Sequence, residues 1–139
     1  MRGRWLAAAG VLLAGCGGGP KPVVPADFRT AWAEVRPCQE SAEHDLQFVR
    51  VRADAVAAAA YGSGEGGALP EGSTVVKEEF LEPGCRTPRG LTAMRKEAGA
   101  WRWQKLSVER EVLEDGDLRK CAACHATCGS ERDGLCGAK

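Results

Sequence analysis

The stretch LTAMRKEAGAWRWQKLSV, residues 91–108, predicts a β-hairpin. It contains two strand-like runs, 91–96 and 101–108, separated by the four residues EAGA at 97–100. A glycine-containing connection of this length is common between antiparallel strands. Because side chains alternate along a strand, Trp101 and Trp103 share one face. We therefore expect these two tryptophans to be core residues or the walls of a pocket.

Two further strands are expected on the N-terminal side of the hairpin. Residues 73–81 begin with β-branched residues, and the alternation places Val75, Lys77 and Glu79 on one face of the strand. Apolar residues between positions 46 and 51 indicate a second strand. With the hairpin, these runs predict a largely antiparallel sheet.

Two short helices accompany the strands in the sequence. Residues 26–36 carry apolar side chains at helical spacing and are followed by Pro37, which favours an amphipathic helix that ends there. Asp54 is a suitable N-cap for a second helix over the alanine-rich residues 55–61. The pattern predicts an α+β fold, with a mainly antiparallel β-sheet packed with two or three short helices, in one domain covering residues 26–139.

The N-terminus resembles a bacterial lipoprotein signal. A basic start precedes the apolar run 5–13, which is too short to span a bilayer as a mature helix. Leu13-Ala14-Gly15-Cys16 resembles a lipobox, in which Cys16 is acylated after removal of residues 1–15. The alternative is a soluble signal peptide that happens to end near a cysteine. We expect an exported, membrane-anchored protein in the periplasm or at the cell surface, with residues 16–25 as its tether.

The charge balance argues against a nucleic-acid partner. The chain of 139 residues has 19 basic and 19 acidic side chains. Loss of residues 1–15 removes Arg2 and Arg4 and no acid, so the mature chain is slightly acidic. A neutral or acidic domain lacks the basic surface that phosphate backbones require.

Near the C-terminus, Cys121-Ala122-Ala123-Cys124-His125 has the C-x-x-C-H spacing of a covalent haem attachment site. In such a site the thiols of Cys121 and Cys124 add to the two haem vinyl groups, and the imidazole of His125 ligates the iron. The motif predicts haem c as the cofactor.

The remaining cysteines fit an oxidising compartment. The chain has seven cysteines, and once Cys16, Cys121 and Cys124 are assigned, an even number is left. Three pairings are conceivable, of which we favour Cys128 with Cys136 and Cys38 with Cys85.

Three alternatives compete with haem attachment. The cysteines at positions 121, 124, 128 and 136 could ligate zinc, although an exported protein disfavours zinc thiolates. The C-x-x-C could be a redox pair, although it follows the sheet and does not open a helix in a βαβ unit. The chain could also be a disulfide-rich lipoprotein whose histidine is coincidental.

The order of these parts resembles the cytochrome P-460 family, which includes the lysine-cross-linked P-460 haem proteins and the β-sheet form of cytochrome c-prime. The resembling segments lie between residues 27 and 127: His44 and the segment up to Tyr61, then 69–78, 91–96, 101–103 and 121–126. The sequence departs from the family after the haem motif, where Cys128 and Cys136 replace its usual run.

The resemblance implies an antiparallel sheet, one c-type haem, thioether roles for Cys121 and Cys124, and an iron held only by His125. An open sixth position would allow binding of nitric oxide or oxidation of hydroxylamine. Catalytic family members also attach a lysine to the haem edge, for which Lys77 is our candidate. Other side chains considered are Lys96 and Lys105 for the cross-link, Glu111 and Glu114 as an acidic base, and Met94 and His44 as a sixth ligand.

The sequence thus predicts a lipid-anchored c-type haem protein that binds a small ligand of the nitric oxide or hydroxylamine type, or transfers electrons to a partner protein. Whether it is an enzyme is left open, because the oxidoreductase activity follows from the resemblance alone. The alternative is a non-haem lipoprotein binding module stapled by disulfides or zinc.

Overall fold

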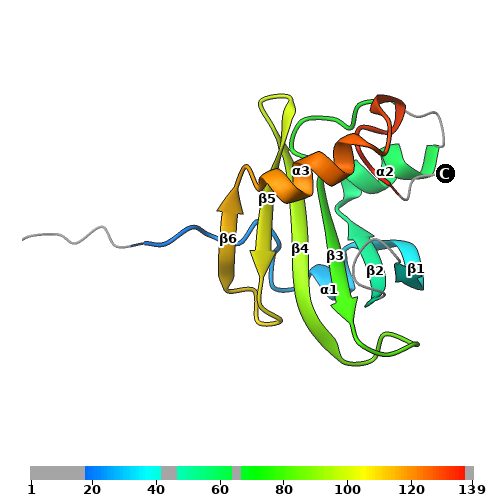
Figure 1. Cartoon of the computed structure of the whole chain (residues 1–139), viewed down its shortest axis with the longest axis vertical. Helices are drawn as coiled ribbons and strands as arrows, with labels where there is room; N and C mark the ends of the chain where they lie inside the picture. The colour runs from blue at the N-terminus through cyan, green and yellow to red at the C-terminus, as the bar shows by residue number, and fades with distance from the viewer. Residues whose placement is uncertain (1–17, 42–46, 64–66, 137–139) are drawn as a thin grey trace, which may run out of the picture.

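The described part of the chain forms a six-stranded antiparallel sheet with three short helices (Figure 1). This computed structural model describes residues 18–41, 47–63 and 67–136. The strands lie in chain order: β1 (Ala33–Ser41), β2 (Gln47–Ala53), β3 (Thr74–Phe80), β4 (Pro88–Glu97), β5 (Ala100–Leu106) and β6 (Val112–Gly116). The helices are α1 (Phe28–Ala31), α2 (Ala55–Ser63) and α3 (Arg119–Ala126), and a 3-10 turn covers Ser130–Arg132. The α+β prediction is confirmed.

The predicted hairpin is present, with a tighter turn than expected. Met94 pairs with Trp103, and the ladder continues until Glu97 pairs with Ala100. The connection is therefore the two residues Ala98 and Gly99, whose φ angles are 50° and 76°. Positive φ at both central positions is typical of the turn that best matches the twist of a hairpin.

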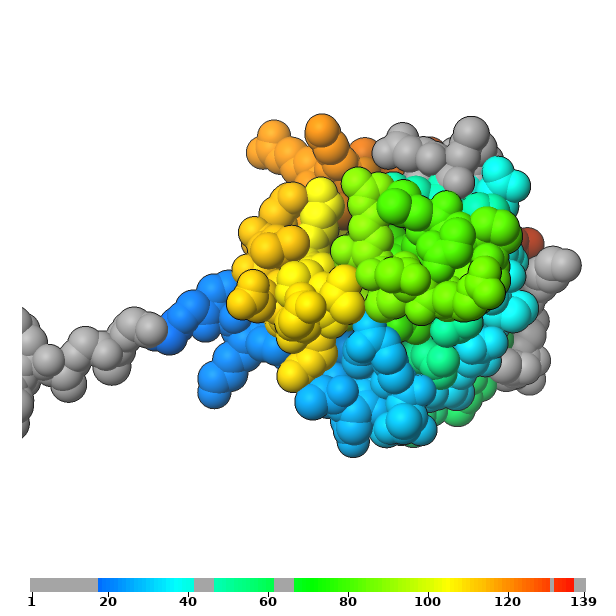
Figure 2. All heavy atoms as spheres, turned by 90° about the horizontal axis from the view of Figure 1, so that it is seen from below, coloured from blue at the N-terminus to red at the C-terminus, as the bar shows by residue number. Residues whose placement is uncertain are grey.

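Each face of the sheet has its own apolar core. On one face, Val75, Met94 and Trp103 pack with Ala57 of α2 and with Leu135. On the other, the alternate residues of the same strands pack against the N-terminal segment and α1, in a cluster of Val24, Phe28, Val76, Leu91, Ala93 and Leu106. Figures 1 and 2 show α3 and the N-terminal segment on opposite sides of the sheet.

The prediction of a helix over residues 26–36 is largely wrong. The helix α1 covers only Phe28–Ala31, and the following residues form the edge strand β1, which pairs with β2 from Ala33 to Ser41. Pro37 lies where the register shifts between Arg36 and Gln39. Because proline lacks a backbone N–H, it is tolerated at such a position in an edge strand.

The expected tether also ends earlier than residue 25. Val24 is fully buried, and the Val23 N–H donates to Gln104 Oε1 at 2.8 Å. Gln104 Nε2 in turn donates to the Lys21 carbonyl oxygen at 2.9 Å. Residues 21–25 therefore belong to the folded domain, because they cover the second face of the sheet.

Two local features complete the fold. Asp54 caps α2 as predicted, since its Oδ1 accepts a hydrogen bond from the Ala57 N–H at 2.8 Å. The strand β6 was not predicted, because its sequence, VLEDG, is short and acidic. Within the three described ranges, no helix is long and apolar enough to cross a membrane.

Candidate functional site

The C-x-x-C-H motif forms most of α3, which lies across the sheet in front of β4 and β5 (Figure 1). Residues three and four apart lie on the same side of a helix, so Cys121, Cys124 and His125 are neighbours. Cys121 is partly buried against the core, Cys124 is exposed, and both thiols are free. The helix therefore presents two thiols and one imidazole together, which is the donor set that covalent haem attachment needs.

The ring of His125 is oriented by the backbone. Its Nδ1 lies 2.7 Å from the carbonyl oxygen of Gly134. Because a carbonyl can only accept a hydrogen bond, Nδ1 carries a proton, and in the neutral form of the ring the lone pair is then on Nε2. The ring also packs edge-on against Trp103, with the centroids 4.6 Å apart. A histidine whose second nitrogen donates to a carbonyl is typical of metal-ligating imidazoles.

Gly134 is required where the chain returns to His125. Its φ angle is +75°, and a Cβ atom at this position would lie 3.3 Å from the His125 carbonyl oxygen. A side chain would therefore combine an unfavourable backbone conformation with a tight contact. The glycine lets the acceptor carbonyl approach the imidazole closely.

The residue before this glycine fixes the segment to the sheet. Both carboxylate oxygens of Asp133 accept hydrogen bonds from the buried Lys96 Nζ, at 2.7 and 2.8 Å. The Leu69 N–H also donates to this carboxylate, at 2.8 Å. The Asp133 carbonyl accepts a hydrogen bond from Trp101 Nε1 at 2.8 Å, and Lys96 Nζ lies 4.9 Å from the centre of the Trp101 ring. The acceptor for His125 is thus held by a side-chain network from β4 and β5.

Both disulfides have the pairing that the sequence favoured. Cys38 is bonded to Cys85, which joins β1 to the loop after β3, and Cys128 is bonded to Cys136. The second disulfide closes the segment that contains Gly134. It also takes two of the four ligands that the zinc alternative needs.

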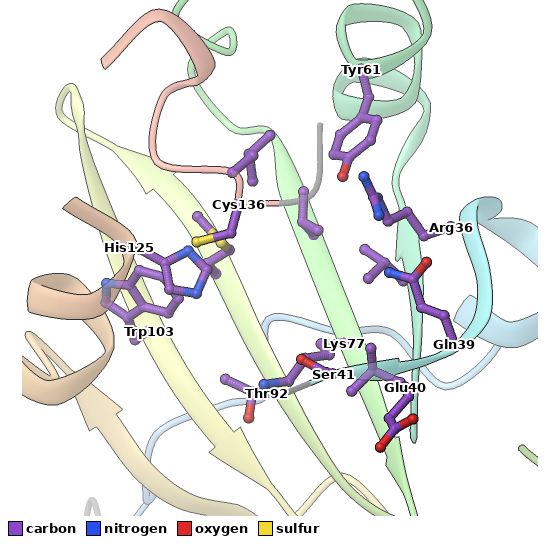
Figure 3. A pocket seen from close by; sticks show the side chains of 15 residues that line it. Arg36, Gln39, Glu40, Ser41, Tyr61, Lys77, Thr92, Trp103, His125 and Cys136 are labelled. Atoms are coloured by element: carbon purple, nitrogen blue, oxygen red, sulfur yellow. The ribbon is translucent and has the colours of Figure 1, made fainter. Parts of the chain in front are cut away.

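A cavity of about 280 Å³ lies between α3, α2 and the sheet (Figure 3). Its walls are partly apolar, and polar side chains line the remainder. The lining residues are Arg36, Gln39, Glu40, Ser41, Val49, Val51, Tyr61, Val75, Lys77, Thr92, Met94, Trp103, His125, Leu135 and Cys136. Largely apolar cavities with a few polar groups are the usual form of small-molecule and cofactor sites.

Among the described residues, Lys77 is the lysine that lines this cavity. Its Nζ lies 3.3 Å from Glu79 Oε1, and the same oxygen accepts a hydrogen bond from the Thr92 hydroxyl at 2.8 Å. Burial lowers the pKa of Lys77, and the nearby Glu79 opposes this effect only in part. The two other candidate lysines do not line the cavity. Lys96 pairs with Asp133, and the exposed Lys105 pairs with Glu114 at 2.9 Å.

The other predicted site residues are distributed as follows. Met94 lines the cavity and is buried between its strand neighbours Val75 and Trp103. Glu111 and Glu114 do not line the cavity. Cys16 and His44 lie outside the residues that the structure describes.

The thiol of Cys121 is a poor candidate for the attacking nucleophile of thiol–disulfide exchange. Burial raises the pKa of Cys121, although Lys105 and Lys77 act in the opposite direction. Reactive C-x-x-C pairs instead lower the pKa of the attacking thiol. The redox alternative therefore loses support.

The sequence did not point to several residues of this site. Arg36 and Tyr61 line the cavity from β1 and α2, and their side chains are hydrogen-bonded to each other. The Asp133-Gly134 pair is a recognisable turn signal, but nothing in the sequence connects it to His125. Long-range contacts of this kind depend on the fold.

Two comparisons with known proteins gave no match. No family model matches the chain, and no curated protein matches it.

Across residues 18–41, 47–63 and 67–136, no group of three or more His, Cys, Asp or Glu side chains is positioned to hold a metal ion. A haem site differs from such a cluster, because the protein supplies a single imidazole and two thiols to it.

Proposed function

We propose that this chain is a c-type haem protein, with Cys121 and Cys124 as the thioether residues and His125 as the proximal ligand. The observation that carries the proposal is the hydrogen bond from His125 Nδ1 to the Gly134 carbonyl at 2.7 Å, on a helix that also presents two free thiols. This contact fixes the tautomer in which Nε2 can ligate iron. When bound, a c-type haem supplies an iron that binds small ligands or exchanges electrons.

The cavity beside His125 favours binding of a small ligand. Val49, Val51 and Val75 give it an apolar wall, and Met94 packs in the core between neighbouring strands. A methionine in this setting contributes packing more often than iron ligation. We therefore propose a ligand of the nitric oxide or hydroxylamine type, with electron transfer to a partner protein as the other role of the same site.

Lys77 is the proposed residue for a haem cross-link, which would make the protein resemble the catalytic members of the cytochrome P-460 family. The support is its place in the cavity and its lowered pKa, because a neutral amine is nucleophilic. Joining Nζ to a haem carbon replaces one N–H bond and one C–H bond, so the step is a two-electron oxidation. A peroxide is the oxidant that we propose to accept the two electrons and two protons. Mass spectrometry of a proteolytic digest tests this proposal. A species that joins the Lys77 peptide to the haem peptide supports it, and a separate, unmodified Lys77 peptide excludes it.

The decisive experiment is maturation of the full chain with a bacterial cytochrome c assembly system. We expect haem mass on the peptide that contains Cys121 and Cys124, and a c-type spectrum that survives denaturing extraction. The Cys121→Ala/Cys124→Ala variant should lose the covalent haem. A His125→Ala variant should retain the thioether-bound haem and recover a ligated spectrum when imidazole is added. A wild-type protein that matures without haem would exclude this proposal and favour the alternative, a non-haem binding module held together by disulfides.

Export and anchoring through Cys16 form a separate proposal with its own test. Metabolic labelling with a palmitate analogue should label the wild-type chain and not Cys16→Ala. The variant should also leave the membrane fraction. A labelled Cys16→Ala protein would exclude acylation at this cysteine.

A further inference from the structure

Arg36 contributes a positive charge to the cavity that has no ion-pair partner in the described ranges. The other arginines of β1 and β2 differ, since Arg50 and Arg52 pair with Glu34. Arg36 is half-buried, and no described carboxylate lies within ion-pair distance of it. Among the described residues that line the cavity, Glu40 is the one acid, and it is exposed. A half-buried guanidinium without a carboxylate partner favours an anion in the adjacent space.

Tyr61 adds a second donor at the same place. Its side chain is hydrogen-bonded to Arg36, and burial raises its pKa, so the hydroxyl stays protonated at neutral pH. A guanidinium can only donate, so the Tyr61 oxygen is the acceptor of that bond and its O–H is left to donate elsewhere. Figure 3 shows the Tyr61 hydroxyl and the Arg36 guanidinium close together at the side of the cavity away from His125.

The chemistry of the pair selects the anion. Guanidinium N–H groups and a hydroxyl O–H together match the two oxygens of a carboxylate. A c-type haem is attached through its vinyl groups, here to α3, and it carries two propionate carboxylates at a different edge. We infer that Arg36 and Tyr61 form a carboxylate-binding subsite whose occupant is a haem propionate, an inference that rests on the proposed function.

The test uses the full chain matured with covalent haem, together with the variants Arg36→Gln, Arg36→Lys and Tyr61→Phe. Arg95→Gln is the matched control, because Arg95 is an exposed strand arginine outside the cavity. Infrared titration of haem with labelled propionates reports their ionisation directly. We expect Arg36→Gln to raise one propionate pKa by about 1 or more, since an adjacent cation lowers a carboxyl pKa by that amount. Arg36→Lys and Tyr61→Phe should give smaller increases, and Arg95→Gln should give none.

An unchanged propionate titration in Arg36→Gln that carries covalent haem would overturn the inference. Titration of the same samples with acetate distinguishes a free carboxylate anion from a haem propionate as the occupant of the subsite. Acetate binding that Arg36→Gln abolishes, with unchanged propionates, would assign the subsite to a free anion and overturn its assignment to haem. A wild-type protein without haem would instead overturn the proposed function. The haem-free chain then tests the subsite alone, because acetate should shift the nuclear magnetic resonance signals of Arg36 and Tyr61 if the carboxylate site exists.

Discussion

His125 Nδ1 donates a hydrogen bond to the carbonyl oxygen of Gly134, nine residues further along the chain, at a distance of 2.7 Å. The contact brings the C-terminal segment back onto α3, the helix that carries the C-x-x-C-H motif. Two features hold it there: the network around Asp133 and the disulfide between Cys128 and Cys136. The orientation of the imidazole therefore depends on residues outside the C-x-x-C-H motif, and each of them can be tested.

Replacing Gly134 by alanine should destabilise the protein by roughly 1–3 kcal/mol, because a residue with a Cβ is strained at positive φ. The new Cβ would also lie 3.3 Å from the His125 carbonyl oxygen. Gly99→Ala is the matched control, since Gly99 has a φ of +76° and a Cβ atom there would meet no other atom within 4 Å. Urea unfolding should show a larger loss for Gly134→Ala. Equal losses would mean that the close approach to His125 contributes nothing.

Replacing Asp133 by asparagine should cost about 3–5 kcal/mol, because it leaves the charge of Lys96 buried without its partner. The Lys96 and Asp133 side chains are only 8% and 14% exposed. Glu114→Gln is the control, since the Lys105–Glu114 pair is about half exposed and such pairs contribute less than about 1 kcal/mol. The free energy of unfolding measures both. A loss for Asp133→Asn no larger than for the control would contradict the structural role of this ion pair.

The lowered pKa of Lys77 predicts a pH dependence of stability. Between that pKa and the ordinary value of 10.5, the unfolded chain binds more protons at this lysine than the folded protein does. Stability contributed by this group therefore rises with pH across that window. Lys77→Met should flatten the rise in the free energy of unfolding at alkaline pH.

Competitive acylation of the wild-type protein checks the same pKa directly. Lys77 should titrate below Lys105, whose pKa is raised chiefly by its hydrogen bond to Glu114. A Lys77 that titrates at or above Lys105 would contradict the effect of burial.

The two disulfides should differ in their contribution to stability. In the chain-entropy account, the Cys128–Cys136 bond, with a sequence separation of 8, contributes about 2.5 kcal/mol. The Cys38–Cys85 bond, with a separation of 47, contributes about 4 kcal/mol. Serine double variants, compared by urea unfolding, should follow this order.

The histidine provides a second measurement for these variants. Because the Cys128–Cys136 bond encloses Gly134, its removal should also weaken the His125 hydrogen bond, which the nitrogen chemical shifts of the imidazole report. The Cys38→Ser/Cys85→Ser variant should leave those shifts unchanged. If the imidazole shifts changed in the Cys38→Ser/Cys85→Ser variant and stayed the same without the Cys128–Cys136 bond, the second disulfide would have no role in orienting His125.

Local patterns were sufficient to predict most of the sheet. Alternation along 73–81 and 91–108 predicted β3, β4 and β5, and Asp54 was recognised as the cap of α2. These features depend on neighbours in the chain, so sequence spacing records them. The helical spacing in 26–36 gave a wrong prediction, because strand pairing with β2 outweighed a weak local preference for helix. The same pairing places Pro37 in an edge strand, where a proline is tolerated.

The environment of His125 depends on contacts between distant segments. The sequence identified the imidazole and the two thiols, because C-x-x-C-H is a local pattern. The fold added Gly134 and Asp133 from the C-terminal segment, and Arg36 and Tyr61 from the other side of the cavity. No spacing rule connects these positions, since burial and hydrogen bonding across the sheet bring them together. The motif thus specifies one imidazole and two thiols, and packing determines their orientation and surroundings.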